Sequence, residues 1–441
     1  MTLPERFERH LSAMALAPGP ALVAVSGGPD SLALLDLLGR SASARRFELH
    51  VAHADHGMYA GSAEVAEQVR VAAAHYGLPF HVTRLALGHS ASETLARTAR
   101  YAWLEHLAEE LGAELIFTGH QQDDQVETIL MRVLKGSGPA GLAGIAPRRG
   151  KIVRPLLPFR REELATYLQD AGFEAWEDPA NRDPRHERSW LRWEILPALR
   201  ARVRRLDRNL LALGRQAAAA RAAWDSMLER LPDLDVKLAC DGVSIAASPL
   251  HGYDSGSLRA LLGALGRRVG CLIGPQRAAQ IDRLLQGGRS GAVAELGNGC
   301  AAELSFGRLR LFRGSAHPSL WVAKLLEGAA GELVAGGWRI LWRREPAPEL
   351  LERAATSSWF TEGTYGARPW RAGDRIRPLG AGGRRLVVRC MQDARIPRSQ
   401  REAWPIIEAA GAIVWVPGVC RSDERIPPPH TQALRIDAQL G

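Results

Sequence analysis

The sequence contains little cysteine and little lysine. Its five cysteines all lie beyond position 239, and no two of them form a CxxC pair. This distribution indicates neither a disulfide framework nor a metal knuckle, and it fits a reducing compartment. The chain also lacks an N-terminal basic segment followed by an apolar run, and it has no stretch of about 18 uncharged apolar residues. We therefore expect a cytoplasmic protein with no membrane partner.

The basic residues are almost all arginine. Only four of the 57 basic residues are lysine, and the formal net charge is +9. Genome base composition can explain the choice of arginine, but it does not explain clustering. Residues 185–221 contain ten arginines against three acids, and residues 368–402 contain the same numbers. Two such segments predict an anionic partner of considerable size.

The pattern of apolar residues predicts three regions. Apolar strands alternate with amphipathic helices from residue 21 to about residue 144, which is typical of an α/β fold with a doubly wound parallel sheet. Residues 160–230 have helical periodicity, and residues 292–314 read as a hairpin. From about residue 331 the chain is strand-like with Gly and Pro punctuation. We expect a catalytic domain at 1–205, a mainly helical middle domain at 206–330 and a small α+β domain at 331–441.

One loop in the first region has the composition of a phosphate site. Ser26-Gly27-Gly28-Pro29-Asp30-Ser31 joins an apolar strand to a helix, so the small residues let backbone N–H groups face an anion at the helix N-terminus. Ser26 and Ser31 can donate to phosphate, whereas Asp30 suits a divalent cation that bridges phosphates. Neither GxxxxGK[ST] nor GxGxxG is present. The string resembles the PP-loop of the ATP pyrophosphatase superfamily (adenine nucleotide α-hydrolase-like fold), which implies cleavage of ATP to AMP and pyrophosphate with Mg²⁺.

An acidic triplet follows a later strand. Asp123, Asp124 and Glu127 open a helix, and the last two share one helical face. Capping of the helix N-terminus explains such acids without any function. Alternatively, paired carboxylates beside a phosphate site can bind the amino groups of a cationic substrate. The first 239 residues contain no cysteine for sulfur transfer or glutamine hydrolysis. A tRNA thiolation enzyme with an external sulfur donor and a non-catalytic RNA-binding protein remain alternatives.

The surrounding motifs carry a more specific resemblance. GHQQDDQVETILMRVLKGSGPAGLAGI at 119–145 resembles the tRNA(Ile)-lysidine synthase family, and so do HADHGM, ARTARYAWL, RPLLPFRREEL, WEDPANRDPRHERSWLRWEILPAL and, near the C-terminus, WRAGDRIRPLG. The resemblance implies a ligase that forms a carbon–nitrogen bond. ATP would adenylate the wobble cytidine of the CAU anticodon of tRNA(Ile), and L-lysine would attack C2 and release AMP. The product would read AUA instead of AUG.

The resemblance also implies roles for individual residues. Those for ATP are Ser26, Gly27, Gly28, Pro29, Asp30 and Ser31, with His53 and His56 lining the pocket. Asp30, through phosphate-bound Mg²⁺, and the lysine-binding residues Asp124, Glu127 and Arg192 would be catalytic, with Arg188 as the alternative to Arg192 for the matching arginine of the family. Arg188, and a C-terminal patch of Trp370, Arg371, Arg375, Arg377, Arg384 and Arg385, would bind tRNA.

Three departures from the family pattern affect the substrate loops. Tyr59 replaces the usual arginine after HG[LM], Ala180 interrupts a DxSN motif, and Ser189 replaces asparagine in an RN pair. The PP-loop and the acidic pair are unaffected. The assembly state stays open, a homodimer included.

Overall fold

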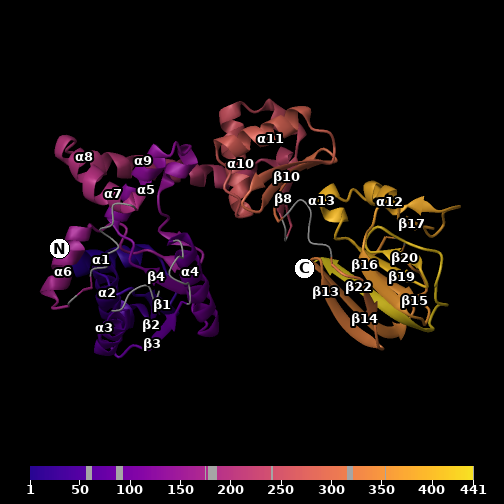
Figure 1. Cartoon of the computed structure of the whole chain (residues 1–441), viewed down its shortest axis with the longest axis horizontal. Helices are drawn as coiled ribbons and strands as arrows, with labels where there is room; N and C mark the ends of the chain where they lie inside the picture. The colour runs from indigo at the N-terminus through magenta and orange to yellow at the C-terminus, as the bar shows by residue number, and fades with distance from the viewer. Residues whose placement is uncertain are drawn as a thin grey trace. The chain divides into compact units, whose positions relative to one another are not determined.

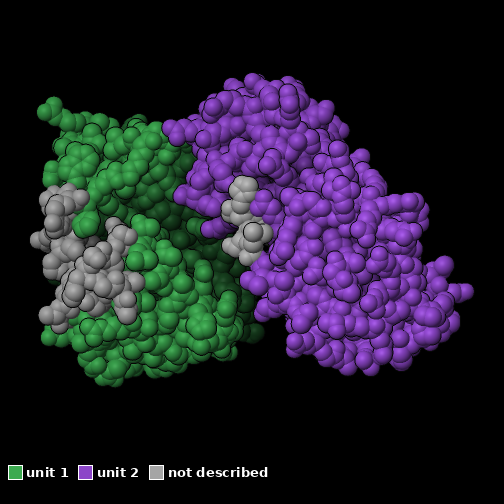
Figure 2. Space-filling model, turned by 45° about the vertical axis from the view of Figure 1, so that its right-hand side comes forward, with its two compact units in different colours: residues 1–220 green, residues 221–441 purple. Residues whose placement is uncertain are grey.

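The computed structural model describes residues 1–55, 62–85, 93–173, 175–176, 186–239, 242–314, 321–352 and 354–440. Within them the chain forms two compact units, residues 1–220 and 221–441 (Figure 2), which we describe separately. The three-domain division with its boundaries stays a prediction. His56, Tyr59 and the loop around Ala180 lie outside the described residues. No helix in these ranges is long and apolar enough to cross a membrane.

Unit 1 contains the predicted parallel sheet. Its strands lie in the order β3 (Phe80–Arg84), β2 (Phe47–Asp55), β1 (Gly19–Ala24), β4 (Leu115–Thr118), β6 (Ile152–Val153) and β5 (Arg148–Arg149). All neighbours pair in parallel except β5 and β6, which form an antiparallel edge. The carboxyl ends of β1, β2 and β4 therefore meet at one edge of the sheet, where ligands bind in such folds.

Helices cover both faces of this sheet. Successive strand residues point to opposite sides, so β1 places apolar side chains on each face for helices to bury. Ala21 and Val23 of β1 pack with α1 (Leu3–Ala13), α2 (Pro29–Arg45), α3 (Ser62–His75) and α6 (Arg161–Asp170). Leu22 points the other way and packs with α4 (Glu93–Glu110). Unit 1 is coloured indigo to magenta in Figure 1.

A second group of helices is built on α5 (Gln122–Leu134), which is followed by the 3-10 helix η1 (Pro139–Ala143). Val126 and Leu130 of α5 pack against Leu191 and Leu196. Leu191 and Leu196 belong to a continuous helical stretch, which consists of α7 (Glu187–Trp190), the π-helical turn η3 (Leu191–Ile195) and α8 (Leu196–Arg202). The next helix is α9 (Leu206–Met227). Pro197 lacks the N–H that would continue regular α-helical bonding, which fits the wider turn before it. This packing brings the arginine-rich stretch to the acidic end of α5.

Unit 2 begins with an antiparallel sheet packed on helices. The strands lie in the order β7 (Lys237–Ala239), β8 (Gly242–Ala246), β11 (Arg308–Arg313), β10 (Cys300–Ser305) and β9 (Ala292–Gly297). The helical elements are η4 (Leu228–Arg230), η5 (Pro232–Leu234), η6 (Ser248–Gly252), α10 (Ser255–Arg268) and α11 (Pro275–Gly287). The helices expected in this region are present, and the predicted hairpin forms β9, β10 and β11. Strands β7 and β8, which the sequence did not indicate, complete the sheet.

One cysteine pair corrects the sequence-based expectation. Cys271, which follows α10, and Cys300, the first residue of β10, form a disulfide, and both are buried. Their separation of 29 residues gives no pairing signal in the sequence. The expectation that no disulfide forms was therefore wrong for this pair. Packing of the α10–α11 loop on the end of β10 brings the two sulfur atoms together.

The C-terminal part of unit 2 has the predicted α+β composition. One sheet has the order β12 (Lys324–Leu326), β16 (Tyr365–Pro369), β19 (Pro405–Ala409), β20 (Ala412–Val416) and β21 (Cys420–Arg421). A second has the order β13 (Ala330–Ala335), β14 (Trp338–Pro346), β22 (Gln432–Leu440) and β15 (Ser357–Phe360). The hairpin β17 (Arg375–Ile376) and β18 (Arg385–Leu386) and the helices α12 (Val387–Asp393) and α13 (Arg398–Arg401) complete it. Phe360, Tyr365 and Trp415 lie at the centre of their common core.

Candidate active site

The predicted phosphate loop connects β1 to α2. Gly28 is the N-cap of α2 in an extended conformation, and Pro29 occupies its first turn. Gly27 has a φ of +87°, and a Cβ at this position would lie 2.4 Å from Cγ1 of Val65 on α3. Glycine is therefore required at position 27 both for its backbone conformation and for the close approach of α3. The loop leaves the N-terminal end of α2 directed toward the ligand edge of the sheet.

Two serines hold the loop in this shape. The Ser31 hydroxyl donates to the Gly28 carbonyl at 2.8 Å and accepts from the Ser26 backbone N–H at 3.1 Å. The hydroxyl oxygens of Ser26 and Ser31 are 3.2 Å apart. Ser31 is buried, whereas Ser26 is exposed. Ser26 can therefore meet an incoming phosphate, while Ser31 mainly fixes the turn.

Asp30 has the features of a cation ligand. Its Oδ1 is buried and has no hydrogen-bond partner within the described part of the chain, while Oδ2 lies 3.7 Å from Nε of Arg161. Burial raises the pKa of Asp30 to about 6; the positive charge of Arg161 opposes this shift and the negative charge of Asp124 adds to it. A buried carboxylate oxygen without a partner, beside a phosphate loop, fits a divalent cation.

The acidic pair lies on α5 at the end of β4. Asp124 accepts the Gln121 backbone N–H at 3.1 Å through Oδ2, so it does cap the helix, as the structural interpretation of the triplet predicted. Its Oδ1 faces the arginines instead. Glu127 is 1% exposed and makes its bonds to Arg188 and Arg192 rather than to the helix N-terminus. Asp123 turns away and binds Arg200 at 2.8 Å. Capping therefore explains only part of the triplet.

Three guanidinium groups converge on the two carboxylates. Arg192 donates to Glu127 through Nε at 2.6 Å and Nη2 at 2.8 Å. Arg188 donates through Nε to Glu127 at 2.9 Å and through Nη2 to Asp124 at 3.1 Å. Arg161 lies 3.4 Å from Asp124 and 3.7 Å from Glu127. The structure thus joins the PP-loop, through Arg161, to the predicted lysine-binding residues.

Comparison with known proteins agrees with this geometry. Residues 4–199 match the family model of a PP-loop domain, and residues 366–438 match that of the TilS substrate C-terminal domain. A tRNA(Ile)-lysidine synthase from Symbiobacterium thermophilum is 35% identical, with coverage of 94% of this chain and 92% of the relative. The chain belongs to the tRNA(Ile)-lysidine synthase family. The tRNA(Ile)-lysidine synthase of Geobacter sulfurreducens is 31% identical over 91% of this chain and 89% of the relative. That of Thermus thermophilus is 33% identical over 99% of this chain and 75% of the relative.

Arg161 is a site residue that the sequence analysis missed. It lies in the RPLLPFRREEL segment that resembles the lysidine synthase family, but no charge pattern singles it out. Its backbone N–H donates to Asp123 at 3.0 Å, which fixes the first residue of α6 beside α5. Its side chain can then reach Asp30, Asp124 and Glu127. Only the packing of α6 next to α5 reveals this role.

Two histidines near the site have lowered pKa values. His53, at the carboxyl end of β2, is buried and donates from Nδ1 to the Val25 carbonyl at 2.8 Å, and burial lowers its pKa. It supports the start of the PP-loop, and its contact with nucleotide stays a prediction. Burial and then the charges of Arg154, Arg97, Arg188 and Arg100 lower the pKa of His120 to about 3.

The residues predicted to bind tRNA lie in two places. Arg188 lies in unit 1 at the acidic pair. In unit 2 the β17–β18 hairpin and its flanks carry five exposed arginines: Arg371, Arg375, Arg377, Arg384 and Arg385. Two of them make ion pairs, Arg377 with Asp423 at 3.0 Å and Arg385 with Asp393 at 2.8 Å. Trp370 instead packs against the core, so it is not part of this exposed patch.

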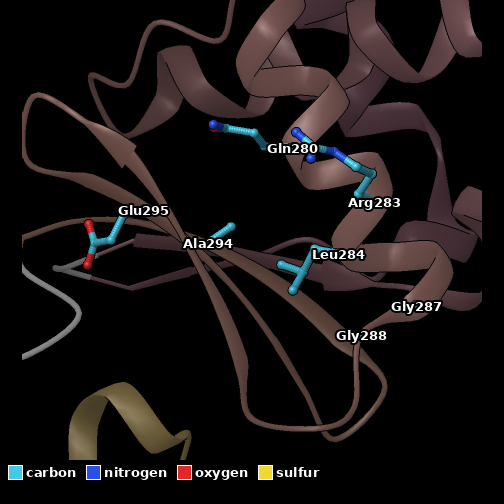
Figure 3. Close-up of a pocket in the computed structure, with 7 residues that line it drawn as sticks. All are labelled: Gln280, Arg283, Leu284, Gly287, Gly288, Ala294 and Glu295. Carbon is cyan, nitrogen blue, oxygen red and sulfur yellow. The ribbon is translucent and has the colours of Figure 1, made fainter.

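Unit 2 has a surface hollow whose lining residues differ from those of the charged cluster in unit 1. It is lined by residues of α11, including Gln280 and Arg283, and by Ala294 and Glu295 of β9 (Figure 3). The charged ends of Arg283 and Glu295 lie on opposite sides of the hollow in Figure 3 and do not converge. None of the residues predicted for ATP, lysine or tRNA lines it. The candidate active site is therefore the charged cluster of unit 1.

Proposed function

We propose that this protein ligates L-lysine to C2 of the wobble cytidine in the CAU anticodon of tRNA(Ile), with conversion of ATP to AMP and pyrophosphate. Membership of the lysidine synthase family supports the substrates. The observation that carries the proposal is that Asp30 of the PP-loop and the buried pair Asp124 and Glu127 share one charge cluster through Arg161. A phosphate site and a site for a cationic substrate thus adjoin each other.

In the first step, O2 of the cytidine attacks the α-phosphorus of ATP and pyrophosphate leaves. The N–H groups at the start of α2 and the Ser26 hydroxyl would bind phosphate oxygens. Asp30 would hold Mg²⁺, which when bound neutralises phosphate charge. The adenylated oxygen is a good leaving group, so the base is now open to attack at C2.

In the second step, the side-chain amine of lysine attacks C2 and AMP leaves. Asp124 and Glu127 would bind an amino group of lysine, and Arg192 would orient the substrate through its planar fork of donors. The attacking nitrogen must lose a proton to become nucleophilic, and a carboxylate that binds the ammonium is placed to accept it. Holding amine and activated base together supplies much of the rate.

The exposed arginines of unit 2 would bind the tRNA backbone. Arg371, Arg375, Arg377, Arg384 and Arg385 gather on one small hairpin region, which suits contact with phosphates rather than with base edges. The reacting cytidine lies in a single-stranded loop, so it can leave the stack at small cost. We expect this reaction in the cytoplasm. Light scattering would decide between a monomer and a homodimer.

Transfer of radiolabelled lysine to bulk tRNA tests the proposal. We expect ATP-dependent incorporation with release of AMP and pyrophosphate. Asp124→Asn should abolish incorporation while tRNA binding is nearly retained, because the substitution changes none of the arginines expected to bind tRNA. Retained incorporation would remove Asp124 from the lysine site. A thiolation enzyme would form AMP and pyrophosphate without incorporating lysine, and a non-catalytic RNA-binding protein would form neither product; the family relatives favour neither alternative.

A further inference from the structure

The carboxylates proposed to bind lysine are already paired in the ligand-free protein. Oδ1 of Asp124 lies within 3.5 Å of nitrogens of Arg161, Arg188 and Arg192. Both oxygens of Glu127 accept from arginine: Oε1 from Arg192 at 2.6 Å, and Oε2 from Arg188 at 2.9 Å and Arg192 at 2.8 Å. Oδ1 of Asp124 and Oε2 of Glu127 therefore each accept at least two donors already, so an ammonium group that binds to these two oxygens must replace one of them.

Among the residues that the structure describes, the charges of the cluster balance. Three carboxylates, of Asp30, Asp124 and Glu127, face the guanidinium groups of Arg161, Arg188 and Arg192. An added ammonium would leave one positive charge without a partner in a site where Glu127 is 1% exposed. Such a charge is costly, because burial removes the water that would solvate it. Binding of an amino group at the pair thus requires that one guanidinium leaves.

The contacts show which arginine can leave most easily. Arg192 binds Glu127 through two nitrogens, and its side chain is only 19% exposed. Arg161 is 30% exposed and lies 3.4 and 3.7 Å from the pair, but its guanidinium group also lies 3.7 Å from Asp30, so its departure would remove a cation from three carboxylates. Arg188 lies at the start of the continuous α7–η3–α8 stretch, its contacts here are with the two carboxylates of the pair, and its side chain is 32% exposed. It can turn into water without moving a core element.

We infer that Arg188 is a resident cation that lysine displaces from Asp124 and Glu127. This inference rests on the proposed function, because it takes these two carboxylates as the lysine site. Arg188 spans both carboxylates with two donors, at 2.9 and 3.1 Å, which is the position that a substrate ammonium would take. The apparent association constant for lysine is then the intrinsic association constant multiplied by the fraction of protein in which Arg188 has left the two carboxylates.

Lysine binding to variants of the full chain tests this inference. Equilibrium dialysis with labelled lysine, without ATP or tRNA, gives the dissociation constant directly. Arg188→Gln and Arg188→Met should bind lysine about tenfold more tightly than the unmodified protein, the scale of one charge-assisted hydrogen bond. Arg200→Gln is the matched control. Arg200 pairs with Asp123 and Asp207 beside the cluster, and within the described part of the chain it makes no ion pair with Asp124 or Glu127.

The outcomes separate this inference from the proposed function. Unchanged or weaker lysine binding in the folded Arg188 variants overturns it, and so does an equal gain in Arg200→Gln, which would reflect overall charge. Glu127→Gln tests the lysine site itself and should lose lysine binding. If Glu127→Gln binds lysine normally, the proposed site is wrong. If it loses lysine while the Arg188 variants gain nothing, only the role of Arg188 is wrong.

Discussion

Substitution of Gly27 by alanine is the sharpest test of the PP-loop geometry. The new Cβ would lie 2.4 Å from Cγ1 of Val65, and the backbone would have to keep a φ of +87°. A positive φ costs a non-glycine residue about 1–2 kcal/mol, and overpacking of this kind adds about 1–3 kcal/mol. We therefore expect a loss of about 3 kcal/mol in the free energy of unfolding of unit 1.

Thermal unfolding measures this loss. For a unit of this size, about 3 kcal/mol corresponds to a fall of roughly 6–12 °C in the melting temperature. Gly28→Ala is the matched control in the same loop. Its Cβ would meet nothing closer than the Ser26 hydroxyl at 3.6 Å, and its φ of −76° is ordinary. We expect a change below about 1 kcal/mol there, because only an N-cap preference is altered.

A double variant separates the two causes. Val65→Ala removes the methyl group that the new Cβ would meet, so Gly27→Ala should cost less in that background, by about 1–2 kcal/mol. The backbone strain should remain. Equal stability of the Gly27→Ala and Gly28→Ala proteins would refute the argument, since it would show that neither positive φ nor the contact with α3 constrains position 27.

Three further predictions follow from the same structure. Arg161→Ala should lower lysine transfer at least about tenfold, because it removes the cation shared by Asp30 and the acidic pair. Arg160→Ala is the control and should transfer lysine normally, because the Arg160 side chain lies 3.7 Å from Asp207 instead. Replacement of Arg375, Arg377, Arg384 and Arg385 by glutamine should flatten the dependence of tRNA affinity on salt by about one unit of slope per lost phosphate contact; an unchanged slope would exclude the hairpin from the interface. Burial lowers the pKa of His120 to about 3, so between about pH 6.5 and pH 3 the unfolded state binds more protons than the folded state. The free energy of unfolding therefore falls as the pH drops through this window. In urea unfolding between pH 7.5 and pH 5, His120→Gln should show a shallower fall of this free energy.

Residues that are close in sequence could be interpreted before the fold was known. Ser26 to Ser31 are contiguous, and Asp124 and Glu127 are one helical turn apart, so elementary rules of turns and helices place each set. Motif order was enough to indicate the family that the comparisons confirmed. Clustering of arginine indicated where exposed positive charge would lie, and the β17–β18 hairpin does carry such a cluster.

Contacts between distant segments depended on the tertiary structure. Arg161 meets Asp124 only because α6 packs beside α5, and Arg188 meets Glu127 across 61 residues of chain. The Cys271–Cys300 disulfide and the packing of the partly buried Trp370 against the core likewise depend on the tertiary structure. The sequence by itself determined the family, the phosphate loop and the acidic pair, because their residues are local. The tertiary structure decided which cations neutralise that pair, because side-chain partners far apart in sequence are set by how elements pack, which no local spacing encodes.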